Sequence, residues 1–171
     1  MVLDQLWAGW RRDYVTLATE LDRGGERAEC VFCRIRESGE PSGENGVLWR
    51  GELSFAVMNL YPYTSGHLLV LPSRHESDLN SLSPEESVDL WETARCATKA
   101  IEAAFSPDGL NLGANLGRAA GAGIPLHLHL HVLPRWSGDT NFMTPVAETR
   151  VISESFESTW SRLRAAWPND R

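Results

Sequence analysis

The chain has 171 residues, the length of one domain with room for short terminal extensions. Its 23 acidic and 16 basic residues give a net charge of -7, which argues against general nucleic-acid binding because phosphate backbones need a basic surface. No apolar run is long enough to span a membrane, and residues 1–12 lack the unbroken apolar core of a signal peptide, so we expect a cytoplasmic protein without nucleic-acid or membrane partners.

Residues 1–29 predict an aromatic arm that ends in a short helix. Residues 6–21 combine two tryptophans and a tyrosine with basic side chains, and Gly24 and Gly25 then break the pattern. The arm either docks its aromatic rings on the main body or forms a loosely ordered tail.

Two of the three cysteines, Cys30 and Cys33, follow in a Cys-x-x-Cys spacing. An odd cysteine count does not suggest a disulfide framework, and in a reducing compartment this spacing is typical of a metal site or a redox pair. A pair of reduced core thiols is the alternative. We assign no role to Cys96, which reads as a small core residue.

The next segments predict antiparallel strands. Residues 47–50 and 53–59 are apolar runs separated by Gly51 and Glu52, which suits a tight hairpin. Residues 67–71 form an apolar run that is short enough to be a buried strand, and its leading histidine is expected to be structural.

A long helix is predicted from Pro84 to Phe105. Ser83 is a suitable N-cap, Pro84 suits the first helical position, and Glu86 can complete a capping box. The residues expected to be buried on this helix are Val88, Trp91, Ala94, Ile101 and Phe105.

A strand over 110–116 precedes residues 117–123, which are too rich in glycine for a stable strand or helix. Glycine lets backbone N–H groups approach a ligand closely, so this loop predicts an anion-binding cradle.

The most informative stretch is the alternating segment His127, Leu128, His129, Leu130, His131 and Val132. Successive side chains of a strand point to opposite faces, so the histidines share one face and the apolar residues share the buried one. Three imidazoles in register need a chemical reason. They indicate a metal site, a nucleophile with its supporting groups, or both.

After the histidines, residues 148–152 predict a short strand and residues 154–167 an amphipathic helix. Strands without regular alternation with helices favour an α+β fold. We expect an antiparallel sheet of about five strands with one long central helix and a carboxy-terminal helix.

Residues 127–133 resemble the signature of the histidine triad (HIT) family. Residues 59–75 are similar to the family's ribose-side strand and its Pro-x-x-x-Gly-His turn, and residues 111–123 to the strand and loop before the triad. The resemblance covers residues 30–136, which we take as the HIT domain, with 1–29 as an arm and 137–171 as an extension packed on it.

The resemblance implies a histidine nucleophile. By the match, His129 attacks an α-phosphorus to give a nucleotidyl-histidine intermediate, and His131 donates a hydrogen bond to phosphate oxygens or to the bridging oxygen. Asn59 matches the position that holds ribose hydroxyls, and Asn115 matches a phosphate-contacting asparagine. Turn or strand-end hydrogen bonding is the alternative role for both asparagines.

Zinc-bearing relatives use a pattern that Cys30, Cys33, His75 and His127 repeat in this chain. The resemblance therefore implies one structural zinc ion per chain, bound by four N or S ligands. One departure concerns the Gly-x-Ser that many relatives place before the triad. Here Gly121, Ala122 and Gly123 stand in that region, and a nest of their N–H groups could replace the missing hydroxyl.

Residues 6–11, 30–33 and 134–142 resemble a bacterial branch associated with dinucleoside polyphosphate cleavage. The expected function is therefore a nucleotidyl hydrolase or transferase acting on a dinucleoside polyphosphate or a related nucleotide conjugate. A phosphorylase that uses inorganic phosphate, and a nucleotide-binding module with vestigial catalysis, are the alternatives. Relatives form two-fold homodimers, and the apolar residues of the 84–105 helix could serve such a contact.

Overall fold

A computed structural model describes residues 30–139 and 154–169. The arm expected at 1–29 and the strand expected at 148–152 lie outside the described residues. In the described ranges, no helix combines the length and the apolar character that crossing a membrane requires.

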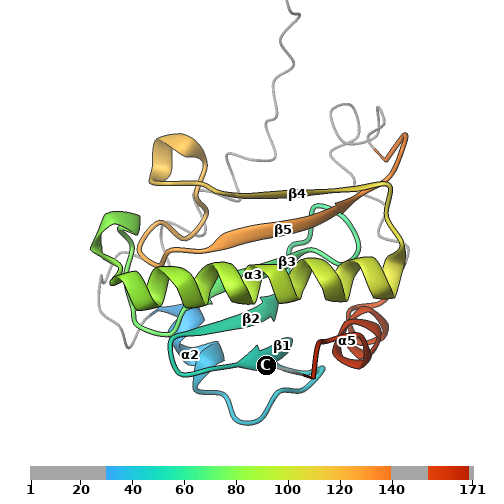
Figure 1. Cartoon of the computed structure of the whole chain (residues 1–171), viewed down its shortest axis with the longest axis horizontal. Helices are drawn as coiled ribbons and strands as arrows, with labels where there is room; N and C mark the ends of the chain where they lie inside the picture. Colours follow the sequence, from blue (N-terminus) through green and yellow to red (C-terminus); the bar gives the residue numbers. More distant parts are fainter. Residues whose placement is uncertain (1–29, 140–153, 170–171) are drawn as a thin grey trace, which may run out of the picture.

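Five antiparallel strands form one sheet in the order β1-β2-β3-β5-β4. The strands are β1 (Val47–Arg50), β2 (Ser54–Met58), β3 (Leu68–Pro72), β4 (Gly109–Ala114) and β5 (Leu130–Arg135). Figure 1 shows the sheet behind the long helix α3. The predicted α+β fold with a five-stranded antiparallel sheet is confirmed.

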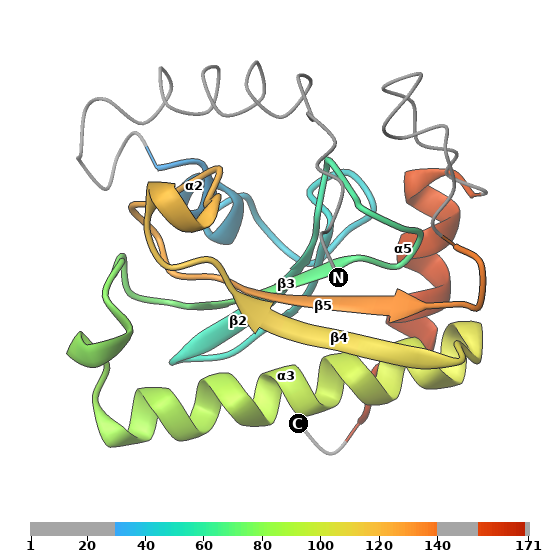
Figure 2. The ribbon, with the colours of Figure 1, turned by 90° about the horizontal axis from the view of Figure 1, so that it is seen from above.

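Three α-helices are described around the sheet: α2 (Val31–Arg36), α3 (Pro84–Phe105) and α5 (Phe156–Ala165). Two short 3-10 helices, η2 (Leu79–Ser81) and η3 (Arg118–Ala120), lie in the connections. Helix α3 runs along one face of the sheet and α2 lies on the opposite side (Figure 2). The predicted carboxy-terminal helix is confirmed as α5.

Side-chain alternation on the central strands divides the core into two parts. On β2, Ala56 and Met58 pack toward α3, whereas Phe55 and Val57 pack on the opposite face. Strand β3 alternates in the same way. Because both faces are covered, β2 and β3 are buried along their whole length, and apart from Ser54 at the start of β2 they read as continuous apolar runs.

Helix α3 begins with the predicted capping box. The Ser83 hydroxyl accepts the Glu86 N–H at 3.1 Å, and the Glu86 carboxylate accepts the Ser83 N–H at 2.8 Å. The helix face on the sheet carries Leu90, Ala94, Ala97, Ala100 and Ile101, all almost fully buried.

The burial predicted for two residues of α3 is wrong. Val88 is 64% exposed and Trp91 is 51% exposed, whereas Ala94 and Ile101 are buried and Phe105 is partly buried. Leu90 and Ala94 define the stripe that faces the sheet, and at 100° per residue Val88 and Trp91 fall outside that stripe.

Helix α5 closes the α3 side of the core at β1. The Trp160 indole N–H donates to the Val47 carbonyl at 2.9 Å. Trp167, just after the helix, stacks on Trp49 of β1 with an interplanar angle of 15°. These contacts attach the carboxy-terminal segment to the first strand of the sheet.

Three local predictions differ from the structure. The strand expected from residue 127 begins at Leu130, so His127 and His129 lie in the segment that leads into β5. The Cys-x-x-Cys pair lies at the start of α2, a helix that the sequence pattern did not predict. Residues 51–53, three rather than two, join β1 to β2.

We expect Ser83→Ala to lower the free energy of unfolding by about 1 kcal/mol, because the Glu86 N–H would lose its acceptor at the start of α3. Urea denaturation measures the change. Ser83→Thr keeps the hydroxyl and is the control. A Thr variant as unstable as the Ala variant would contradict the capping account.

Candidate active site and metal centre

The triad histidines and their apolar neighbours point to opposite sides of the sheet. Leu128, Leu130 and Val132 belong to the core on the α3 side, so the alternating histidines face the side that carries α2. Phe32 of α2 covers them, with its ring 5.7 Å from that of His127 and 5.3 Å from that of His129.

The two leading histidines are therefore enclosed. His127 is 0% exposed and His129 is 6% exposed, so they do not form the open row of imidazoles that alternation alone suggests. Phe32 was not predicted as a site residue, although it stands between the two cysteines in the sequence.

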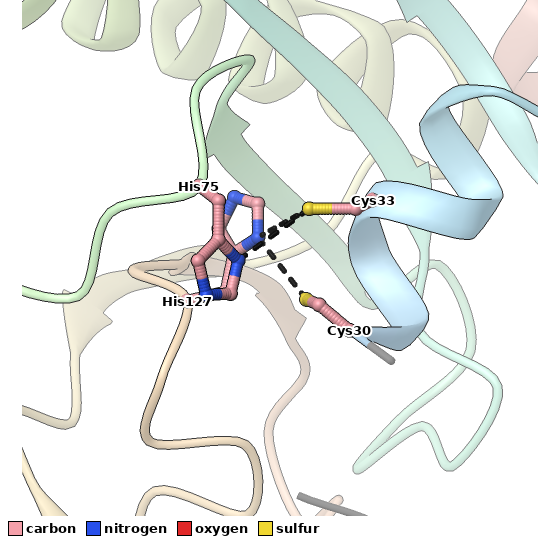
Figure 3. A group of neighbouring side chains, drawn as sticks. All are labelled: Cys30, Cys33, His75 and His127. Carbon is pink, nitrogen blue, oxygen red and sulfur yellow. Dashed lines mark hydrogen bonds between the residues drawn. The ribbon is translucent and has the colours of Figure 1, made fainter. Parts of the chain in front are cut away.

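Four side chains from three separate parts of the chain meet beside α2. Cys30 and Cys33 come from the start of the helix, His75 from the segment after β3, and His127 from the segment before β5 (Figure 3). One potential ligand atom from each residue lies within 4.8 Å of all the others. The structure thus brings together the four residues predicted as metal ligands.

The distances between the potential ligand atoms fit tetrahedral coordination of a metal ion. Cys30 Sγ lies 3.4 Å and Cys33 Sγ 3.7 Å from His127 Nδ1, and Cys33 Sγ lies 3.4 Å from His75 Nδ1. Zinc bonds of about 2.3 Å to sulfur and about 2.0–2.1 Å to nitrogen place tetrahedral ligand atoms about 3.3–3.8 Å apart. The donor set and its spacing therefore fit Zn²⁺.

The second ring nitrogen of His127 is fixed by the main chain. Its Nε2 lies 3.0 Å from the carbonyl oxygen of Pro72 and so carries the hydrogen, which leaves the Nδ1 lone pair facing the two sulfurs. Burial lowers the pKa of His127 to about 4, so the imidazole is neutral and able to bind a metal at pH 7.

The loop that carries His75 is attached to the start of α3. Arg74 forms ion pairs with Glu76 at 2.8 Å and with Glu86 at 2.9 Å. The hydrogen bonds from Arg74 lower the pKa of Glu86 to about 2. The Glu76 carbonyl in turn accepts the Leu128 N–H at 2.7 Å, so this loop also holds the segment before β5.

One ring nitrogen of His129 donates a hydrogen bond to the main chain, and the other carries no hydrogen. Its Nδ1 lies 2.8 Å from the His127 carbonyl oxygen. A carbonyl only accepts, so Nδ1 carries the hydrogen and Nε2 carries the lone pair of a neutral ring. Burial lowers the pKa of His129, which also favours the neutral form. The result is an imidazole prepared to act as a nucleophile at Nε2.

His131 lies next to His129, with ring centroids 5.1 Å apart. Its Nδ1 lies 2.9 Å from Nε2 of His67. Its Nε2 is shielded from solvent and has no hydrogen-bond partner among the described residues. Burial lowers the pKa of His131 to about 4, so this ring is also neutral at pH 7.

Of the two asparagines predicted on the substrate side, Asn59 has hydrogen-bond partners within the protein. Asn59 accepts the Tyr61 N–H at 3.1 Å, and its amide nitrogen lies 3.2 Å from His67 Nδ1. Asn115 follows directly after β4 and is partly buried. The turn-forming role held open for Asn59 is thus present in the structure.

The glycine loop differs from the nest that we expected. The Gly121 N–H donates to the Arg118 carbonyl at 2.9 Å, and the Ala122 N–H donates to the Gly117 carbonyl at 3.3 Å. Both groups close the turn around η3, so they do not form a run of N–H groups open to an anion. A sequence with many glycines predicts a turn but not which of its N–H groups it uses.

Comparison with known proteins agrees with this geometry. Residues 42–138 match the HIT domain. The chain is 38% identical over 166 residues to a protein of Mycobacterium tuberculosis strain CDC 1551 named AP-4-A phosphorylase, covering 96% of this chain and 85% of that protein. It is 40% identical over 93 residues to a Schizosaccharomyces pombe protein named bis(5'-nucleosyl)-tetraphosphatase (asymmetrical), covering 54% of this chain and 50% of that protein.

A solved structure is also similar. A zinc-bound histidine triad family protein from Mycobacterium smegmatis superposes with a TM-score of 0.66 at 30% identity, covering 82% of this chain and 94% of that one. The family match spans more than half of the chain, and the Mycobacterium tuberculosis relative is similar along nearly all of it. The chain belongs to the histidine triad (HIT) family.

Proposed function

We propose that this protein is a nucleotidyl transferase or hydrolase that cleaves a dinucleoside polyphosphate, of the diadenosine tetraphosphate type, at an α-phosphate. The observation that carries the proposal is the environment of His129, a buried neutral ring whose Nδ1–H is held by a carbonyl and whose Nε2 is free of hydrogen. The names of the relatives described above support the substrate class.

In the first step, Nε2 of His129 attacks the α-phosphorus. The bond from that phosphorus to the bridging oxygen breaks, and its electron pair leaves with the polyphosphate of the second nucleotide. His131 donates a hydrogen bond from Nε2 to the oxygen that gains charge. The product of this step is a nucleotidyl-His129 intermediate.

In the second step, an acceptor oxygen attacks the same phosphorus and His129 leaves. Inorganic phosphate as the acceptor gives a nucleoside diphosphate, whereas water gives a nucleoside monophosphate. The similarity to the AP-4-A phosphorylase extends along nearly the whole chain, so we favour phosphate as the acceptor. The tetraphosphatase match, which covers 54% of the chain, keeps hydrolysis as the second candidate.

Four further residues complete the proposed site. Asn59 contacts the ribose, Asn115 contacts a phosphate oxygen, and Gly121 and Gly123 shape the loop around the phosphates. Since the Gly121 N–H is already used within the turn, its contribution would be conformational, consistent with its φ of 91°.

We expect His129→Ala to lower turnover by several orders of magnitude without unfolding the protein, because it removes the atom that bonds to phosphorus. His131→Ala should cost about 100- to 1,000-fold, because it removes one hydrogen bond to the developing charge. Steady-state kinetics on a panel of dinucleoside polyphosphates, with circular dichroism as the folding check, measures both.

Product analysis with and without inorganic phosphate identifies the acceptor. Nucleoside diphosphate formed only with phosphate indicates phosphorolysis, and monophosphate formed in both conditions indicates hydrolysis. Binding of the nucleotides without turnover would instead support an interaction module with vestigial catalysis. Full activity in His129→Ala would rule out the mechanism.

We further propose that Cys30, Cys33, His75 and His127 bind one structural zinc ion per chain. The tetrahedral spacing of their ligand atoms and the zinc bound in the Mycobacterium smegmatis relative support this assignment. Side chains would fill all four coordination positions of a tetrahedral zinc ion, so no position would be left for substrate. The ion would connect α2 to the segment before β5. On the sequence argument, we also propose a cytoplasmic location.

We expect about one zinc ion per chain in protein purified without chelator, and its loss in Cys33→Ser together with a lower melting temperature. Cys96→Ser is the matched control, because this buried cysteine lies on α3 in the other core and should leave the zinc content unchanged. Wild-type protein without zinc would contradict the assignment, as would an equal loss of zinc in both variants.

The chain is also proposed to form a homodimer. In the described part of the chain, β4 is the last strand of the sheet and exposes Leu112, with Leu116 exposed just after it. Helix α3 exposes Val88 and Trp91, so an open strand edge and an apolar helix face are both available. A two-fold contact would cover such surfaces on both copies.

Sedimentation equilibrium at micromolar concentration should give twice the 19.0 kDa mass of the chain. We expect Trp91→Glu to shift the mass toward the monomer, because it places a charge in the proposed contact. A monomeric wild-type protein would contradict the proposed dimer.

A further inference from the structure

A fourth histidine, His67, is connected to the triad through His131. It lies directly before β3 and is 1% exposed. Its Nε2 is 2.9 Å from Nδ1 of His131. It does not contribute to the metal cluster, so its burial beside His131 needs another explanation.

Two N–H donors determine which nitrogen of His67 carries the hydrogen. The main-chain N–H of Tyr63 donates to Nδ1 at 3.1 Å, and a main-chain N–H can only donate. The Asn59 amide nitrogen reaches the same atom at 3.2 Å. The orientation of this amide is fixed in turn, because its oxygen accepts the Tyr61 N–H. Nδ1 of His67 is therefore an acceptor, and its hydrogen is on Nε2.

This assignment determines the tautomer of His131. The Nε2–H of His67 donates to Nδ1 of His131, so Nδ1 of His131 holds the lone pair and Nε2 holds the hydrogen. That Nε2 is the buried atom with no partner among the described residues. His129 has the opposite arrangement, with its hydrogen on Nδ1. Adjacent rings are thus set as a nucleophile and a hydrogen-bond donor.

Tyr63 also fixes the planes of the two rings. Its ring stacks on His131 at 5.7 Å with an interplanar angle of 19°, and lies 4.7 Å from the ring of His67. The same residue therefore supplies the N–H that sets the tautomer of His67 and the ring that limits rotation of His131. The sequence places Tyr63 in a turn, and nothing in its pattern indicates either role.

We propose that His67 is a positioning residue, which holds His131 as the neutral tautomer with its Nε2–H facing the nucleotide. It acts through His131 and does not touch the reacting phosphorus. The proposal deepens the function proposed above and rests on it for the role of His131. The tautomers themselves can be measured without any substrate.

Nitrogen-15 NMR of the histidine rings in the full chain at neutral pH is the first test. We expect protonated Nε2 in His67 and His131, and protonated Nδ1 in His129. A protonated Nδ1 in His131 would overturn the proposal and leave the nucleophilic role of His129 untouched. Inactivity on every dinucleoside polyphosphate would instead count against the proposed function and leave the tautomer result standing.

Two substitutions separate positioning from general stability. His67→Leu removes the donor, so we expect the His131 signals to show both tautomers and kcat to fall about tenfold to hundredfold with KM changed much less. His67→Gln keeps an N–H that can reach Nδ1 of His131, and should restore the single tautomer and most of kcat.

Val70→Ala is the matched control. Val70 lies on β3, three residues from His67, and packs toward α3, so its truncation destabilises the same strand without touching the histidine pair. We expect lower stability with unchanged tautomers and kcat. If His67→Leu does not fold, the wild-type spectrum and the His67→Gln variant still test whether His67 positions His131. A Gln variant that keeps the His131 tautomer but loses 100-fold in kcat would overturn the proposal.

Discussion

The hydrogen bond from Nδ1 of His129 to the carbonyl of His127 is the interaction on which the proposed chemistry depends. A carbonyl cannot donate, so this 2.8 Å contact fixes the hydrogen on Nδ1 and exposes a lone pair on Nε2. This hydrogen bond can orient the His129 ring only if the main chain at His127 stays in place. That main chain is held by the Leu128 N–H on the Glu76 carbonyl and by the His127 ring on the Pro72 carbonyl.

The proposed metal centre supports the same segment from the other side. His127 faces the two sulfurs of α2 with Nδ1, and the ring lies beside Phe32, which also covers His129. Metal binding and nucleophile orientation would thus be adjacent functions of one short segment. His67, directly before β3, would complete the arrangement, because its hydrogen bond to Nδ1 of His131 connects it to the triad. Each imidazole has a different partner, which would account for the different roles proposed for three identical residues.

The sequence predicted those features that follow from local pattern. Alternation placed Leu128, Leu130 and Val132 in the core, and the Ser83 capping box located the start of α3. Family resemblance predicted the four candidate metal ligands that the structure brings together. The failures depend on tertiary packing: which stripe of α3 meets the sheet, and which N–H groups the glycine loop uses itself. The partners of His67 are donors from a turn, and no periodicity reports them.

The central claim is a covalent bond between Nε2 of His129 and the α-phosphorus of a nucleotide. Rapid mixing of the enzyme with a dinucleoside polyphosphate labelled at the α-phosphates, followed by quenching and peptide mass spectrometry, tests it directly. The account predicts one nucleotidyl group on the peptide that contains residues 127–131, located at His129 and absent from His129→Ala. A label on another residue, or rapid turnover with no covalent species at any time, would contradict it.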